Sequence, residues 1–136
     1  KRQGITLEGK NVCLVGRGDT VGKPLRFLLL NENATVTVCH TRTKDLGSHT
    51  RKAEIVVAAA GKANLITKDM ISPGTVVVDA GINDLDGKTV GDVDYAAVSE
   101  VAGAITPVPG GVGSLTTALI QKNLLKAIDL QGVNRP

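Results

Sequence analysis

The sequence predicts an α/β fold in which helices cover both faces of a parallel sheet. Short apolar runs alternate along the chain with segments of helical periodicity, and this order favours successive strand–helix–strand units. The core has to be aliphatic, because the 136 residues include one Phe, one Tyr and no Trp. Parallel sheets are usually built from such residues. Because this length suits one core, we expect a single domain over residues 1–136.

Strands are expected where short apolar runs are bounded by glycine or polar residues: 11–15, 34–39, 55–59, 75–79 and 101–105. Helices are expected over 23–30, 45–52, 68–71, 93–99 and 114–128. Residues 84–88 suit a turn between two short extended pieces, and residues 131–136 are expected to fray. Right-handed crossovers would place the carboxyl ends of all the strands along one edge, where ligands bind in such sheets.

A glycine-rich loop follows the first expected strand. Gly16, Gly18 and Gly22 have the spacing G-x-G-x-x-x-G, one residue longer than the commonest dinucleotide-binding form, and a helical pattern follows at once. In that context such a loop turns tightly and aims backbone amides at a pyrophosphate. The pattern therefore predicts a doubly wound, Rossmann-like parallel sheet that binds a dinucleotide.

A second loop, residues 103–113, is rich in proline and glycine and leads from the last expected strand into the last expected helix. Proline fixes the backbone torsion φ, whereas glycine permits positive φ and close approach of a ligand to the main chain. We expect this loop to bring the N-terminus of a helix to a pocket, where it attracts anions. A plain linker is the alternative.

The residues after the second expected strand indicate which dinucleotide binds. NAD sites usually have Asp or Glu there to hold the ribose diol, whereas this chain has Thr41 and Arg42. A hydroxyl and a guanidinium suit the 2′-phosphate of NADP, which a carboxylate would repel. Arg17, in the glycine loop, is placed to reach the same phosphate. NADP is therefore preferred over NAD; the alternative is that Arg17, Arg42 and Lys44 are only solvated surface charges.

Composition argues against several other functions. The net charge of +3 is small, the basic residues are dispersed and aromatic residues are scarce, so no nucleic-acid partner is expected. No apolar run approaches the roughly 18 residues of a membrane span, and no signal peptide is visible. Cys13 and Cys39 lack metal-site spacing and suit reduced thiols in a cytoplasmic protein. No metal site is expected.

Four groups of residues in this chain have counterparts in a known family. They are GR with VGKP in the first loop, ATVTVCH over 34–40, DAGIN with VGDV over 79–93, and TPVPGGVG over 106–113. With these motifs the chain, from Gly4 to about Ile128, resembles the nucleotide-binding domain of bifunctional methylenetetrahydrofolate dehydrogenase/methenyltetrahydrofolate cyclohydrolase. The resemblance implies NADP as cofactor, tetrahydrofolate derivatives as substrates of the full enzyme, and a homodimer.

The resemblance also implies roles for individual residues. Gly16, Arg17 and Gly18 would hold the pyrophosphate and adenosine side of the cofactor. Thr41 and Arg42 would hold the 2′-phosphate.

At the other end of the cofactor, the resemblance implies that Ile82 lines the nicotinamide site. Residues 110–116, including Gly110, Gly111 and Thr116, would border the pocket shared with the folate. The chain departs from the family at two places: Gly18 stands where Ser is usual, and Ser114-Leu115 where Pro-Met is common.

No catalytic residue is expected in this chain. In the family the catalytic Tyr and Lys lie in an N-terminal domain, and this chain is expected to begin where that domain ends. The lysines at 23, 62 and 88 stand in other motifs. Tyr95 is expected to pack, His40 to cap or fill the core, and His49 to face solvent. Asp92 is expected to cap the helix that follows it.

Two other functions remain open at this point. One is a module that binds NADP without turnover. The other is a different NADP dehydrogenase, similar to shikimate dehydrogenase, which also has an Arg-Thr pair after its second strand; the Pro107–Gly113 loop speaks against it.

Overall fold

The computed structural model describes residues 4–132, and within them a five-stranded parallel sheet forms the centre of the fold. Its strand order is β2-β1-β3-β4-β7. The strands are β1 (Asn11–Val15), β2 (Thr35–Cys39), β3 (Ile55–Ala58), β4 (Val76–Asp79) and β7 (Ala104–Ile105). The predicted doubly wound, Rossmann-like class is therefore confirmed.

Strand β1 lies inside the sheet, and the strands that follow it in the chain are placed first on one side of it and then on the other. Strands β2 and β3 both pair with β1, with Val12 opposite Val36 on one side and Ile55 on the other. The turns after β1 and β3 therefore diverge, and this is the place where open α/β sheets bind ligands. Strands β1 and β3 are mostly apolar because both of their faces are covered. In β1 the last four residues are buried, and in β3 all four are.

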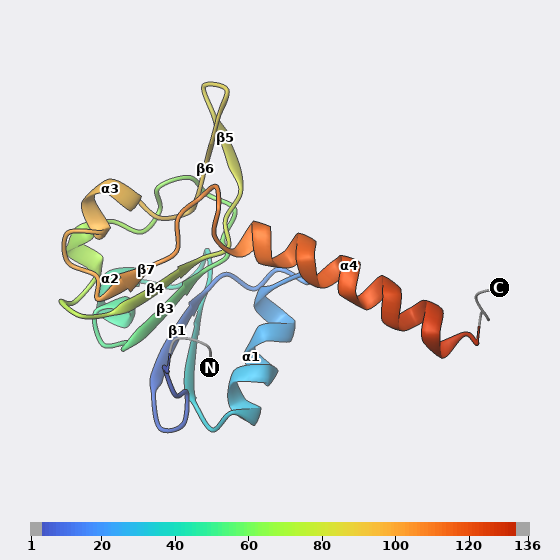
Figure 1. Ribbon diagram of the computed structural model, residues 1–136. Helices are drawn as coiled ribbons and strands as arrows, with labels where there is room; N and C mark the ends of the chain where they lie inside the picture. The colour runs from blue at the N-terminus through green and yellow to red at the C-terminus, as the bar shows by residue number, and fades with distance from the viewer. Residues whose placement is uncertain (1–3, 133–136) are drawn as a thin grey trace.

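Alternate residues of the strands form two cores on opposite faces of the sheet. On one face Leu14 and Val57 pack under Leu29 of α1 (Gly22–Asn31). On the other face Val56 and Val77 pack with residues from three short helices. These helices are α2 (Leu46–Thr50), the 3-10 helix η1 (Lys68–Met70) and α3 (Tyr95–Val98). Figure 1 shows α1 on one side of the sheet and α2 with α3 on the other.

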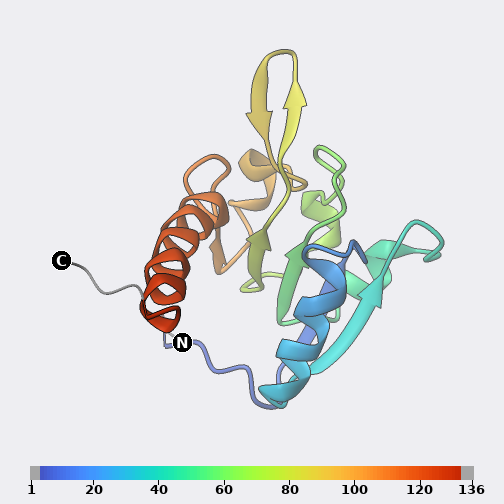
Figure 2. The same cartoon turned by 90° about the vertical axis from the view of Figure 1, so that its right-hand side faces the viewer.

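Two elements project from this body. A two-stranded antiparallel hairpin, β5 (Asn83–Leu85) and β6 (Lys88–Val90), leaves the carboxyl end of β4, and Asp86 and Gly87 turn it with φ of 52° and 75°. The helix α4 (Val112–Leu130) extends away from the sheet with no buried residue. Figures 1 and 2 show both projections. Within residues 4–132, no helix is long and apolar enough to cross a membrane.

The element boundaries differ from the predicted ones mainly near the end of the chain. The strand expected over 101–105 is only Ala104–Ile105, because the backbone N–H groups of Val101 and Ala102 donate to Val98 O and close the end of α3. The last helix is longer than expected, at 19 residues. Of the tail expected to fray, residues 131 and 132 form a turn after α4, and residues 133–136 lie outside the described part of the chain.

Asp92 does not cap α3, so that expectation is wrong. Asp94 is the capping residue: its carboxylate accepts a hydrogen bond from the backbone N–H of Ala97 at 3.3 Å. Val93, expected in the helix, instead forms a parallel bridge with Ile66. This bridge carries Asp92 inward, where its side chain is fully buried.

Candidate functional site

The carboxyl edge of the sheet carries two hollows. The first, of about 630 Å³, lies where β1, β2 and β3 end. Its lining residues are Val15, Gly16, Arg17, Gly18, His40, Thr41, Thr43, Leu46, Ala59, Ala60, Lys62 and Leu65. Four of the candidate residues chosen from the sequence, namely Gly16, Arg17, Gly18 and Thr41, are therefore brought together at the divergence of β1 and β3.

The glycine loop is held tightly between α1 and β3. Gly16 has φ of 123° and its N–H donates to Cys39 O at 2.9 Å; a Cβ there would run into the carbonyl of Ala59. A Cβ on Gly22 would lie 2.5 Å from Gly16 O. Gly18 has nothing within 4 Å of its Cβ position, so the serine usual in the resembling family would fit there.

The N-terminus of α1 contacts this loop and no side chain caps it, but the N–H of Lys23 donates to Gly18 O at 2.9 Å and Pro24 has no N–H. The helix dipole still favours an anionic group near this end. The exposed Arg17 adds a positive charge at the mouth of the same hollow. The hollow is thus suited to a phosphate-bearing ligand.

The turn after β2 is fixed by its own side chains. The N–H of His40 donates to Thr43 Oγ1 at 2.9 Å, and the N–H of Arg42 donates to His40 Nδ1 at 3.1 Å. The side chain of His40 thus closes this turn and does not cap a helix. Thr41 lines the hollow, whereas Arg42 is exposed and is not among the lining residues. Thr43 and Lys62 do line it and were not among the candidates; their positions after β2 and β3 are the signal that was available.

The second hollow, of about 710 Å³, lies between the end of β4, the start of α1 and the loop before α4. It brings together the remaining candidates Ile82, Gly110, Gly111 and Thr116. Ile82 is 73% exposed and therefore offers an apolar surface to a ligand. The hydroxyl proton of Thr116 is used within α4, because the hydroxyl donates to Val112 O at 2.9 Å.

The glycines of the second loop are not equivalent. Gly110 has φ of 101°, which a side chain rarely adopts, and a Cβ on Gly111 would run into the carbonyl oxygen of Pro107. Gly113 has open space around its Cβ position and an ordinary φ. No side chain caps the N-terminus of α4, which begins at this loop, so its first-turn amides can bind an anionic or polar group.

Tyr95, His49, Cys13 and Cys39 are not among the lining residues of either hollow. Tyr95 is 46% exposed rather than packed, and His49 is exposed as expected. Cys13 and Cys39 are buried with their Sγ atoms 3.7 Å apart. Burial, with Cys39 beside it, raises the pKa of the Cys13 thiol to about 12. No cluster of three metal-ligating side chains occurs in the described residues.

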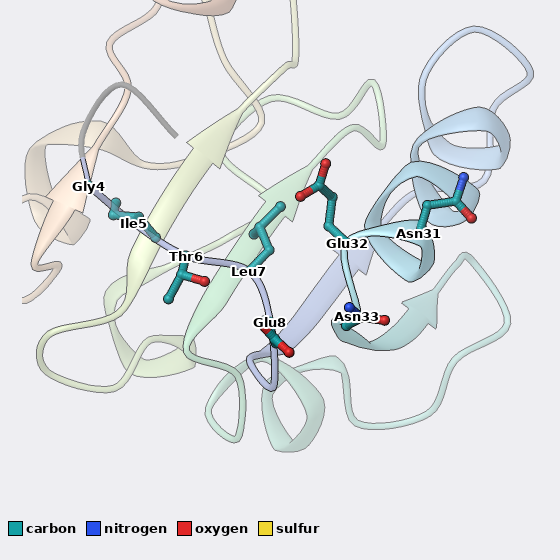
Figure 3. Close-up of a pocket in the computed structure, with 8 residues that line it drawn as sticks. All are labelled: Gly4, Ile5, Thr6, Leu7, Glu8, Asn31, Glu32 and Asn33. Carbon is teal, nitrogen blue, oxygen red and sulfur yellow. The ribbon is translucent and has the colours of Figure 1, made fainter.

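A further hollow, of about 400 Å³, lies between the N-terminal segment and the end of α1 (Figure 3). None of the candidate residues is among its lining residues. Among residues 4–132, its lining includes the carboxylates of Glu8 and Glu32 and no Lys or Arg. Carboxylates repel phosphates. The dinucleotide expected from the sequence therefore fits the two hollows at the carboxyl edge and not this one.

A parallel α/β sheet with a glycine loop at its switch point and two uncapped helix N-termini at one edge defines a nucleotide-binding domain of the Rossmann class. Over residues 1–132 the chain matches the family described as "Tetrahydrofolate dehydrogenase/cyclohydrolase, NAD(P)-binding domain". The chain belongs to that family.

Similar proteins of known name agree with this assignment. The chain is 66% identical over 131 residues to the bifunctional protein FolD of Desulforamulus reducens, and 65% identical over 130 residues to FolD 2 of Desulfitobacterium hafniense. Each alignment covers 96% of this chain and 46% of the relative. The chain thus spans about half the length of the curated relatives it matches.

Solved structures show the same fold at high similarity. The bifunctional FolD dehydrogenase/cyclohydrolase of Campylobacter jejuni superimposes with a TM-score of 0.92 at 47% identity, over 96% of this chain and 46% of that one. The Trypanosoma brucei enzyme, complexed with NADP cofactor and an inhibitor, gives 0.90 at 38% identity, over 98% and 48%. Relationship to this family is favoured over one to shikimate dehydrogenase.

Proposed function

We propose that this chain is the NADP-binding domain of an enzyme that oxidises 5,10-methylenetetrahydrofolate to methenyltetrahydrofolate and hydrolyses that product to 10-formyltetrahydrofolate. The proposal takes residues 1–136 as one domain and assigns the folate chemistry to a separate catalytic half. The observation that carries it is family membership over residues 1–132, together with a phosphate-suited hollow at the switch point of the sheet.

The first hollow would hold the adenosine and phosphate half of NADP. Gly16 and Gly18 would bring the main chain close to the pyrophosphate, and Arg17 and Thr41 would bind the 2′-phosphate. In the described part of the chain, no carboxylate lines this hollow to oppose a second phosphate. Arg42 follows Thr41 but does not line the hollow, and would add a weaker attraction from outside it.

The second hollow would hold the nicotinamide half. Ile82 would form an apolar wall for the ring, and Gly110, Gly111 and Thr116 would border the space shared with the folate. When bound, the nicotinamide supplies the hydride chemistry. The residues of this chain orient the cofactor and exclude water from one side of it. With no catalytic group among them, the chain alone would bind cofactor without turnover.

Finer expectations follow from the same proposal. Two buried, reduced thiols suit a cytoplasmic location. Apolar side chains exposed on α1 and α4, such as Phe27 and Leu124, suit a chain that contacts further protein, and a homodimer of the full enzyme is part of the proposal.

A chimaera tests the proposal. We suggest replacing the corresponding half of the Desulforamulus reducens relative with this chain and following NADPH formation by absorbance, with methylenetetrahydrofolate as substrate. The chimaera should reduce NADP, and the 136-residue chain alone should not. A chimaera that folds and binds NADP but leaves it unreduced would contradict the assigned activity. Turnover by the chain alone would contradict the absence of catalytic residues.

A further inference from the structure

Two buried carboxylates adjoin the proposed cofactor site, and the proposed function uses neither of them: Asp79 is among the lining residues of the second hollow, and Asp92 lines neither hollow. Asp79 ends β4 and is 3% exposed, and Asp92 follows the hairpin and is 0% exposed. The N–H of Asp92 donates to Asp79 Oδ1 at 3.0 Å, so the two residues form one connected unit. Burying two carboxylates is unfavourable unless hydrogen bonds compensate. Their partners therefore show what the carboxylates hold in place.

Asp92 binds the loop after β3. Its carboxylate accepts hydrogen bonds from three consecutive backbone N–H groups, those of Ala60, Gly61 and Lys62, the last two at 2.9 Å each. Ala60 and Lys62 line the first hollow. The shape of that side of the hollow is thus set by one carboxylate that lies 30 to 32 positions further along the chain.

Asp92 also reaches the second hollow. Its Oδ1 accepts a hydrogen bond from Asn83 Nδ2 at 2.9 Å, and Asn83 directly follows Ile82. Residue 81 is bound by the other carboxylate, because the N–H of Gly81 donates to Asp79 Oδ1 at 2.8 Å. The residues on both sides of Ile82, Gly81 and Asn83, are thus hydrogen-bonded to the two carboxylates. This fixes the backbone of Ile82, whose apolar side chain is 73% exposed at the second hollow.

Glycine is required beside both carboxylates. A Cβ on Gly81 would collide with Asp92 Oδ1, and a Cβ on Gly91 would collide with Asp79 Oδ2. Two main-chain segments thus pass in direct contact with the carboxylates. Because this packing leaves no room for alternative positions, the carboxylates are fixed as well as hydrogen-bonded.

We propose that Asp92 is a positioning residue for the cofactor: its carboxylate holds the Ala60–Lys62 loop and Asn83 in a fixed relation, so that the two hollows bind the two halves of one dinucleotide. This inference rests on the proposed function, since it assigns the hollows to the halves of NADP.

The four donors around Asp92 explain why a carboxylate is needed. A carboxylate offers acceptors only, and each oxygen of Asp92 takes two donors. An asparagine has one acceptor oxygen and one NH₂ group. In either orientation of the carboxamide, the NH₂ would face two donors. Asp92→Asn therefore keeps nearly the same shape, but its NH₂ group lies against two hydrogen-bond donors where the carboxylate offered an acceptor.

The test measures binding by the 136-residue chain with two probes. Calorimetry with 2′,5′-ADP reports on the first hollow alone, and the fluorescence of bound NADPH reports on the environment of the nicotinamide. Asp92→Asn should weaken 2′,5′-ADP and NADPH about tenfold, equivalent to one charge-assisted hydrogen bond, and change the NADPH emission. Asp94→Asn is the matched control, because that carboxylate caps α3 and touches neither hollow; it should leave both readouts unchanged.

An exchange of partners separates positioning from general stability. Asn83→Asp alone would set a carboxylate against Asp92 and should also weaken binding. In the double variant Asp92→Asn/Asn83→Asp, the new amide donates to the new carboxylate, while its oxygen still accepts from Ala60 and Gly61. Part of the lost affinity should return.

Three results would overturn the proposal: wild-type binding by a folded Asp92→Asn chain, loss of its native circular dichroism spectrum, or no recovery in the double variant. Failure of the unmodified chain to bind NADPH would instead contradict the proposed function.

Discussion

The carbonyl oxygen of Gly16 lies 2.5 Å from the point that a Cβ on Gly22 would occupy. This contact brings the first turn of α1 against the glycine loop, whose residues 16–18 line the first hollow. Gly22 is buried, and the atoms it meets are backbone atoms of residues 16 and 17 that have little room to move.

Gly22→Ala should therefore destabilise the chain and weaken NADP binding together. Overpacking a site of this kind costs about 1–3 kcal/mol in the free energy of unfolding. Urea unfolding followed by circular dichroism measures the loss. Gly18→Ser is the control in the same loop, because its Cβ has open space, and it should retain wild-type stability. Equal stability of the two variants would contradict the close packing.

The two arginines of the site should differ in their effect. Arg17 lines the first hollow and Arg42 does not. Loss of a charge-assisted contact to phosphate costs about 1.5–3 kcal/mol, so Arg17→Ala should weaken NADP roughly tenfold or more and leave NAD nearly unchanged. Arg42→Ala should have a smaller effect on NADP. Calorimetric titration of both variants with both cofactors gives the comparison. A larger loss of NADP affinity in Arg42→Ala than in Arg17→Ala would indicate that Arg42 is the main contact of the 2′-phosphate.

The glycines of the second loop provide a second matched pair. A Cβ at Gly111 meets the carbonyl of Pro107, whereas a Cβ at Gly113 meets nothing within 4 Å. Gly111→Ala should therefore lower NADP affinity while the chain stays folded, and Gly113→Ala should not. Gly47, on α2, would not serve as a surface control, because it is buried beside Arg51. Binding that is unchanged in both variants would leave the loop with no more than a linking role.

Stability should depend on pH through Asp79. Burial raises the pKa of its carboxyl above the ordinary value of 3.8, although hydrogen bonds from the backbone of Gly81, Asp92 and Val93 act in the opposite direction. A raised pKa in the folded state means that the folded chain holds this proton more tightly than the unfolded chain. The contribution of Asp79 is therefore full below 3.8 and is lost as pH rises through the folded pKa.

Urea unfolding of the wild type and of Asp79→Asn at several pH values isolates this contribution. Glu54, Asp69 and Glu100 have lowered pKa values and give the opposite slope, but they are common to both chains and cancel in the difference. The difference in free energy of unfolding, wild type minus variant, should fall as pH rises from 3.8. Parallel profiles would show that Asp79 has the same pKa folded and unfolded.

The cysteines should be unreactive while the chain is folded. Both are buried, and the pKa of Cys13, raised to about 12, leaves almost no thiolate at neutral pH. A thiol reagent such as a maleimide should label neither cysteine in native buffer and both in denaturant. Mass spectrometry measures the labelling. Rapid labelling of the folded chain would contradict the prediction and show that the buried cysteines become exposed to solvent.

The sequence predicted the parts of the fold that depend on local pattern. β1 and α1 were found because an apolar run, a glycine loop and a helical period follow one another in the chain. β7 was overestimated because Val101 and Ala102 are apolar for another reason: they pack partly buried against the core beside Val98. A strand at the sheet edge and a partly buried loop have the same composition.

Candidate site residues could be chosen from the sequence where they follow closely after an expected strand. Gly16, Arg17 and Thr41 follow directly after strands, so their placement at the carboxyl edge was expected. Asp92 was assigned to a helix cap because its true partners begin at Ala60, 32 residues away, and no local pattern reports a contact of that separation. The signal that was available lies in two glycines: Gly81 leaves space for the carboxylate of Asp92, and Gly91 for that of Asp79.

The central claim is that this chain binds NADP at the carboxyl edge of its sheet and prefers it to NAD because of Arg17 and Thr41. Calorimetric titration of the unmodified chain with each cofactor tests it most directly. We predict tighter binding of NADP, by roughly tenfold or more for one charge-assisted phosphate contact, and a difference that disappears in Arg17→Ala/Thr41→Ala. Equal affinities for NADP and NAD, or binding of neither, would contradict it.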